Sequence, residues 1–384
     1  MGIPKDGNST AAGGSATGAA PATAGSPGAP ASASSPGSAG APAKRVSKGR
    51  SASTIALLAF LLVLTMLISF TLGHFDITVP EVIGVALNQL FGIGEIEEPA
   101  HLTVIRQVRF PRIVAAVVIG MALAGAGASY QGLFKNPMVS PDLLGASAGA
   151  GFGACLALLL GWNLLMVQVT AFVFGIVAVS LTYAISVIVS RGHSMTLCLV
   201  LTGIVVSALF QAFITMGKYV ADPNDKLPAI TYWLMGGLTS IHLDDLPMLL
   251  IPVAVGIVPM LAFRYQLNAL SFGDEEARAL GVNTSALRFL YIACATLVTA
   301  SAVAAAGMVG WVGLVIPHLA RMIVGPNNKV LLPASLLLGG IYLLVIDDMC
   351  RCLFSLELPL SVLTAVIGAP FFIYLLTRGR KTWA

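Results

Sequence analysis

Long apolar segments recur along the chain and are separated by short polar, glycine-containing or proline-containing stretches. A run of about 20 apolar residues is long enough to cross a bilayer, and only a helix satisfies its own backbone there. The pattern predicts ten spans: 54–73, 109–133, 143–161, 165–190, 196–217, 245–263, 286–307, 311–324, 331–349 and 359–377. Shorter runs at 80–91 and 228–237 predict partial or interfacial helices. We therefore expect an all-α polytopic membrane protein.

The composition agrees with this pattern. Hydrophobic residues make up 57% of the chain and charged residues only 10%, whereas a soluble domain carries roughly 25% charged residues. The five cysteines show no metal-ligand spacing. A fold in lipid is therefore expected, rather than one aqueous globular core.

The first 43 residues are mostly Ala, Gly, Ser, Pro and Thr. Such a segment buries too little apolar surface to fold, so it is expected to be disordered. The basic residues Lys44, Arg45, Lys48 and Arg50 then precede the first apolar run. This arrangement also occurs in secretory signals, but no small-residue cleavage site follows the run. We expect a tail over 1–53, with an uncleaved first span opening a helical membrane domain over 54–378.

The Lys and Arg residues indicate the topology. With ten spans and the N-terminus in the cytoplasm, fifteen of the 21 fall on the cytoplasmic side. The other six are Arg106, Arg109, Arg112, Lys218, Lys226 and Arg351. This asymmetry follows the positive-inside rule, and an odd number of spans would break it at one end. Both termini are therefore predicted to be cytoplasmic.

A short helix is predicted at 273–282, on the cytoplasmic side between two spans. Asp274 is placed to cap its N-terminus, where Glu275 and Glu276 favour the helix dipole. Arg278 lies near the other end, and Gly281 can adopt the left-handed conformation that ends a helix. The apolar side of this helix consists of Phe272, Ala277, Leu280 and Val282. A helix of about seven residues is not stable alone in water, so it must pack on its own bundle or on another protein.

Three arginines recur every third residue where the second span begins. Arg106, Arg109 and Arg112 are expected to share roughly one face of a helix on the outer side. Arg351, at the outer end of the ninth span, is placed to join them. They either anchor the chain to lipid phosphates or receive carboxylates from a soluble partner as bidentate pairs.

Small residues recur every fourth position in two spans, a spacing that lets helix backbones approach closely in a membrane. They are Gly120, Ala124 and Ala128 in the second span, and Gly145, Gly149 and Gly153 in the third. No sequence motif for an enzyme appears, and no mid-membrane acidic or lysine pair suggests an ion relay. We expect no catalytic residue, no cofactor, no metal site and no nucleic-acid partner.

Eight segments stand out in order along the chain. They are RFPR at 109–112, QGLFKNPMVSPDLLG at 131–145 followed by GA at 149–150, YWLMGG at 232–237, GDEEARALG at 273–281, GLVIPHLAR at 313–321, LP at 332–333, ELP at 357–359 and IGAP at 367–370. Together they resemble the permease subunits of FecCD-type ABC importers, also called type II importers, which take up iron chelates, haem and cobalamin. The resemblance extends across about 54–378.

The resemblance implies a permease that dimerises, with the translocation path between the two copies, in the cell (inner) membrane. It implies two cytoplasmic ATP-binding subunits that dock around Gly273, Asp274, Glu275, Glu276, Ala277, Arg278, Leu280 and Gly281. It also implies an extracytoplasmic binding protein whose acidic residues pair with Arg109, Arg112 and Arg351. By the same resemblance, Asn136, Met138, Ser194, Met195 and Thr196 match cytoplasmic gate positions, although Met195 departs from the small polar residue expected there.

Ferric siderophores, haem and cobalamin all stay open as substrates, with molybdate-type oxyanions as an alternative. An ion-gradient secondary transporter and a membrane receptor without a transport path are the alternatives from other classes. The lack of intramembrane acids argues against the former, and substrate uptake by reconstituted protein would exclude the latter.

Overall fold

A computed structural model describes residues 48–73, 75, 77–91, 99–190, 194–353 and 356–379. Within these ranges all regular secondary structure is helical, as expected of an all-α protein. The predicted disordered segment 1–43 lies outside the described residues. The basic residues Lys48 and Arg50 begin the first helix, six residues before the predicted start of the first span.

Each of the ten predicted spans contains a helix. These helices are α1 (Lys48–Thr71), α4 (Phe110–Leu133), α5 (Ala146–Leu159), α6 (Leu164–Val189), α7 (Met195–Val220), α9 (Leu246–Ala262), α12 (Thr284–Ala306), α13 (Val312–Val324), α14 (Asn328–Cys352) and α15 (Leu360–Gly379). The remaining elements are α2 (Val79–Phe91), α3 (Pro99–Thr103), η1 (Val104–Arg109), η2 (Pro141–Leu144), α8 (Lys226–Met235), η3 (Leu243–Asp245), α10 (Arg264–Leu270) and α11 (Asp274–Ala279). The interfacial runs predicted at 80–91 and 228–237 correspond to α2 and α8.

Among the described residues, seven helices are long and apolar enough to cross a membrane. Helices α5, α13 and the apolar part of α15, Leu360–Tyr374, are shorter. A helix rises about 1.5 Å per residue, so these three do not reach across the full hydrocarbon core by themselves. The number of crossings and the side of each terminus therefore stay predictions.

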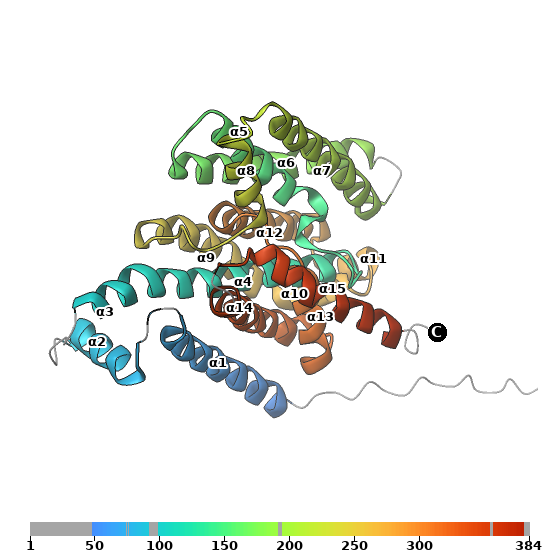
Figure 1. The fold of residues 1–384 in the computed structure, drawn as a ribbon. Helices are drawn as coiled ribbons and strands as arrows, with labels where there is room; N and C mark the ends of the chain where they lie inside the picture. The colour runs from blue at the N-terminus through green and yellow to red at the C-terminus, as the bar shows by residue number, and fades with distance from the viewer. Residues whose placement is uncertain are drawn as a thin grey trace, which may run out of the picture. The chain divides into compact units, whose positions relative to one another are not determined.

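Helix α4 lies at the centre of the bundle. In its most apolar stretch 83% of the residues are buried, against 17% for α1. It packs on α14, α12 and α13, and α12 in turn contacts α6 and α9. Figure 1 shows α4, α12 and α14 between two groups of helices, α1 to α3 and α5 to α8.

The small residues predicted to allow close packing do so. A Cβ atom placed on Gly120 of α4 would lie 2.2 Å from the carbonyl oxygen of Gly339 on α14. On α5, Cβ atoms on Gly149 and Gly153 would each lie 2.4 Å from a carbonyl oxygen of α6. Gly145 differs, because its φ of 91° places it at the left-handed junction between η2 and α5. The close-contact prediction is therefore confirmed at the other three glycines.

Candidate functional site

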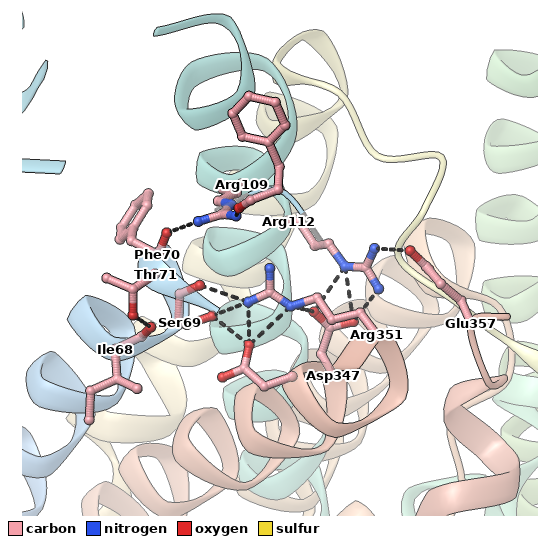
Figure 2. Close-up of polar contacts among 11 residues, drawn as sticks. Ile68, Ser69, Phe70, Thr71, Arg109, Arg112, Asp347, Arg351 and Glu357 are labelled. Atoms are coloured by element: carbon pink, nitrogen blue, oxygen red, sulfur yellow. Dashed lines mark hydrogen bonds and ion pairs between the residues drawn. The ribbon is translucent and has the colours of Figure 1, made fainter. Parts of the chain in front are cut away.

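Four elements bring the predicted arginines together at one end of the bundle. Arg109 ends η1, Arg112 lies in the first turn of α4, and Arg351 lies in the last turn of α14. The end of α1 and the segment 356–359 complete the site (Figure 2). Pro111 supports this arrangement because a proline fits the first turn of a helix, where its missing N–H has no partner to lose.

Arg112 binds two carboxylates from distant parts of the chain. Its Nε lies 2.9 Å from Oδ2 of Asp347 and its Nη2 lies 2.9 Å from Oδ1, which makes a side-on bidentate pair. Its Nη1 donates to Oε1 of Glu357 at 3.0 Å. Asp347 is fully buried. The pair therefore fixes α4 against α14, and removing one partner would leave the other charge buried at a cost of about 3–5 kcal/mol.

Arg351 and Arg109 donate hydrogen bonds to backbone carbonyls at the end of α1. The last carbonyls of a helix lack intrahelical partners, and arginine side chains often supply the missing donors. Nη2 of Arg351 donates to the carbonyl oxygen of Ser69 at 2.8 Å, and Nη1 of Arg109 donates to that of Phe70. The Ser69 hydroxyl and Arg351 both also bind Asp348. Two arginines and one acid thus hold α1 to the bundle.

These side chains form an arginine cluster that is balanced in charge. Its members are Arg109, Arg112, Arg351, Asp347, Asp348 and Glu357. The three arginines are at most 7% exposed. Together with Glu357 they line a cavity of about 280 Å³ that also reaches Gly73 and Val108. The cavity therefore presents buried guanidinium groups whose charge is already offset within the chain.

Glu357 is the most accessible acid of the cluster, with 31% of its side chain exposed. Partial burial opposes its ionisation, but hydrogen bonds and charge from Arg112, the Thr239 hydroxyl and the charge of Arg351 outweigh burial and lower its pKa. It is therefore a carboxylate near neutral pH.

The structure brings Arg109, Arg112 and Arg351 together, as predicted, but separates Arg106 from them. Arg106 is exposed, whereas Arg109 and Arg112 are buried. The cause is η1, a π-helical segment in which the amide of Phe110 donates to the carbonyl of Ile105. A π-helix has a wider turn than an α-helix, so the predicted shared face is wrong for Arg106.

The acidic partners were missed in the sequence. Asp347 pairs with Arg112 across 235 positions, which no local pattern reveals. A partial signal existed, because Asp347 and Asp348 lie four and three residues before Arg351 in an apolar helix. Charges in such a helix are expected to pair with one another.

The predicted cytoplasmic helix is α11. Arg288 of α12 holds it through Asp274, with Nη2 and Oδ2 2.9 Å apart. The prediction that Asp274 caps the helix is wrong: the N-cap is Gly273, whose φ is 140°, and the Asp274 carboxylate binds Arg288 instead. Gly281 has a φ of 80°, which confirms its left-handed conformation.

The two sides of the α11 region differ in solvent exposure. Ala277 is fully buried, while Phe272 and Leu280 are 71% and 68% exposed. Glu275, Glu276 and Arg278 are also exposed, and Arg278 donates to the Thr284 hydroxyl. The helix is therefore packed on its own bundle through Ala277 and leaves two large apolar side chains uncovered.

The predicted gate positions lie on two segments. Asn136 and Met138 are both exposed in the turn after α4, where the Asn136 side chain accepts the amide of Met138 at 2.9 Å. Ser194 is the exposed N-cap residue of α7, and Met195 and Thr196 are half-buried in its first turn. A gating role for these residues stays a prediction.

Comparison with known proteins decides the family. The model of the FecCD transport family matches residues 61–378. The chain belongs to the FecCD transport family. The permease protein MolB of a molybdate import system from Haemophilus influenzae is 39% identical over 325 residues, covering 84% of this chain and 95% of that protein. The cobalamin import permease BtuC of Halobacterium salinarum is 40% identical over 295 residues, covering 77% of each chain.

The fold comparison agrees with this membership. A solved inward-facing structure of a metal-chelate type ABC transporter is 36% identical, with a TM-score of 0.77, and the match covers 85% of this chain and 99% of that one. Members of the FecCD family are non-catalytic permease subunits of ABC importers. This chain is therefore a multi-pass membrane protein and a permease subunit of an ABC importer.

Proposed function

We propose that two copies of this FecCD permease form the translocation path for an iron chelate, such as a ferric siderophore or haem, or for cobalamin. Separate ATP-binding subunits supply the energy from the cytoplasm, and a binding protein delivers the substrate from outside the cell membrane. The observation that carries the proposal is the surface around α11, where Phe272 and Leu280 stay exposed beside a helix anchored to its own bundle.

The ATP-binding subunit docks on this surface. An exposed apolar side chain on an anchored helix gains free energy when a partner's groove covers it, and such central apolar contacts dominate many interfaces. The acidic first turn, with Asp274, Glu275 and Glu276, surrounds the contact with charge. Ala277 and Gly281 then set the position of the helix, and Leu280 is the residue that enters the groove.

The substitution Leu280→Asp tests this contact. It puts a charge into a packed interface and should cost a few kcal/mol of association free energy. We expect normal membrane insertion, with loss of copurification of the ATP-binding subunit and of transport-linked ATP hydrolysis. The matched control is Leu356→Asp, because Leu356 is 80% exposed in the segment on the other predicted side of the membrane. Equal copurification in both variants would rule out the Leu280 contact.

The binding protein docks at the arginine cluster. Arg109, Arg112 and Arg351 line a cavity large enough for carboxylate side chains, and guanidinium groups bind carboxylates with defined geometry. Reversing two charges, Arg109→Glu with Arg112→Glu, should abolish docking of the extracytoplasmic binding protein. Basal ATP hydrolysis should persist if the fold survives, which thermal unfolding of the purified variant would establish. If the double variant bound the binding protein as tightly as wild type at low and high salt, these arginines would have a purely structural role.

Substrate identity is decided by uptake. Reconstituted permease, ATP-binding subunit and binding protein should transport a ferric siderophore, haem or cobalamin in an ATP-dependent manner. The relative named as a molybdate import permease favours molybdate as the second candidate. Parallel uptake assays with labelled molybdate and cobalamin separate the two, and uptake driven by an ion gradient without ATP would refute the importer proposal.

A further inference from the structure

One carboxylate connects the arginine cluster to the segment that follows α8. Oε1 of Glu357 accepts from Nη1 of Arg112 at 3.0 Å, and its Oε2 accepts from the Thr239 hydroxyl at 2.9 Å. Arg112 belongs to α4, whereas Thr239 lies four residues beyond the end of α8. Glu357 is thus a bridge between two parts of the chain that are distant in sequence.

Accessibility separates Glu357 from the other acids of the cluster. The side chains of Asp347 and Asp348 are 1% and 9% exposed, against 31% for Glu357. Withdrawing Asp347 would leave Arg112 with an uncompensated buried charge. A carboxylate that enters the cavity from outside can therefore replace Glu357, but not Asp347.

The cavity also holds donors for such an incoming group. Arg112 uses three of its five N–H groups for Asp347 and Glu357. Nη1 of Arg351 makes no hydrogen bond within the described part of the chain. An entering carboxylate that displaces Glu357 from Arg112 can thus bind both arginines without disturbing the buried pairs.

We propose that Glu357 occupies the Arg112 site until a partner carboxylate takes its place, and that this exchange frees Thr239 and loosens the segment after α8. The inference rests on the proposed docking of a binding protein at the arginine cluster. It assigns Glu357 a positioning role: its charge competes with the partner, and its second oxygen links docking to the chain beyond α8.

Few other hydrogen bonds hold the segment after α8. The amide of Gly237 donates to the carbonyl of Ala306 at 2.9 Å, and the carbonyl of Gly236 accepts from the amide of Leu360 at 3.1 Å. The Leu238 side chain is buried in the core, whereas residues 239–240 are exposed. Loss of the Thr239 bond should therefore raise mobility at 239–240 and leave 236–238 in place.

The first test measures affinity. The variant Glu357→Gln removes the competing charge and keeps the size of the side chain. We expect the extracytoplasmic binding protein to bind this variant about three- to tenfold more tightly than wild type in nanodiscs. The salt dependence should become steeper, since one fewer internal charge offsets the arginines. The control is Asp244→Asn, which makes the same charge change at an exposed residue outside the cavity and should leave affinity within twofold.

The second test measures mobility by hydrogen exchange of the full chain in nanodiscs. Binding of the same protein should raise amide exchange at 239–240 in wild type. Thr239→Val should raise exchange there without a partner and should abolish the further increase on docking. Exchange at α5, which holds none of these residues, serves as the internal reference.

The outcomes separate this inference from the docking proposal. If Arg109→Glu with Arg112→Glu leaves binding intact, docking itself is refuted. If that variant abolishes binding and still unfolds at the wild-type temperature, while Glu357→Gln binds equally or more weakly than wild type, docking stands and the exchange is refuted. A purely structural Glu357 would weaken binding on substitution, so the direction of the change decides. Unchanged exchange at 239–240 on docking would refute the release of Thr239.

Discussion

The close contact between α4 and α14 should be intolerant of a single methyl group. A Cβ atom at Gly120 would lie 2.2 Å from the Gly339 carbonyl oxygen and 2.9 Å from Cβ of Leu343. Real Cβ atoms essentially never approach a neighbour within 3.0 Å. Backbone atoms cannot turn aside as a flexible side chain does, so Gly120→Ala must move the two helices apart by about 0.8 Å.

Three contributions set the magnitude. Forcing extra volume into a packed contact costs about 1–3 kcal/mol, and alanine recovers up to about 1 kcal/mol of helix propensity relative to glycine. The same displacement stretches the pair between Arg112 and Asp347, about two turns away, from 2.9 Å to beyond hydrogen-bond range. Losing part of a buried pair worth about 3–5 kcal/mol brings the net destabilisation to about 2–4 kcal/mol.

The assay is thermal unfolding of the purified protein in detergent, where the loss should lower the melting temperature by roughly 4–8 °C. Because large proteins often unfold irreversibly, half-lives at one fixed temperature should be compared as well. The control is Gly132→Ala on the same helix, where the nearest atom is Cδ2 of the buried Leu267 side chain at 3.0 Å.

The control gains the same helix propensity and meets a side chain rather than rigid backbone, so its melting temperature should fall clearly less than that of Gly120→Ala. If Gly120→Ala and Gly132→Ala were equally stable, the helices would not be in the contact described. The attribution of stability to backbone proximity would then be wrong.

Two further predictions concern the predicted cytoplasmic end. Asp274→Ala removes the carboxylate that Arg288 binds at 2.9 Å. Because the pair is partly exposed, the free energy of unfolding should fall by only about 1 kcal/mol or less. Copurification of the ATP-binding subunit should fall clearly, and unchanged copurification would contradict the anchoring role. Asn268→Ala removes the hydrogen bonds to the Asn328 amide and the Asn327 side chain. The affinities for the ATP-binding subunit and the binding protein should persist, while ATP hydrolysis stimulated by the binding protein should fall. Full stimulation would show that α10 does not couple the binding protein to the ATP-binding subunit.

The positions of the membrane helices were predictable because lipid imposes a strong constraint. A spanning segment must be apolar and helical, so the hydrophobic runs located each helix to within a few residues. The ends were harder, because α1 continues to Lys48 through polar residues that no bilayer constraint marks. Likewise α5 and α13 are shorter than a full span, and their apolar composition does not report length.

Only the basic residues of the candidate site were predictable from the sequence. Arginines at the end of a span stand out against the charge rule, so Arg109, Arg112 and Arg351 were identified. The acid that neutralises Arg112 lies 235 positions away, and the pairing depends on how α4 meets α14. The π-helical turn in η1 also escaped prediction, since no Gly or Pro marks it, and it moved Arg106 out of the cluster.

Helix α14 connects the two candidate surfaces. Near its C-terminal end, Asp347 and Arg351 belong to the arginine cluster, and at its N-terminal end the amide of Asn328 donates to the Asn268 side chain of α10. Its 25 residues correspond to a length of about 37 Å. The contact with α4 at Gly120 lies between the two ends and resists sideways movement. Pro333 lies between that contact and Asn328, and a proline inside a helix removes one backbone hydrogen bond. A shift of α14 at the cluster can therefore reach the Gly120 contact along a regular helix, and Pro333 is the point at which the helix can bend before it meets α10.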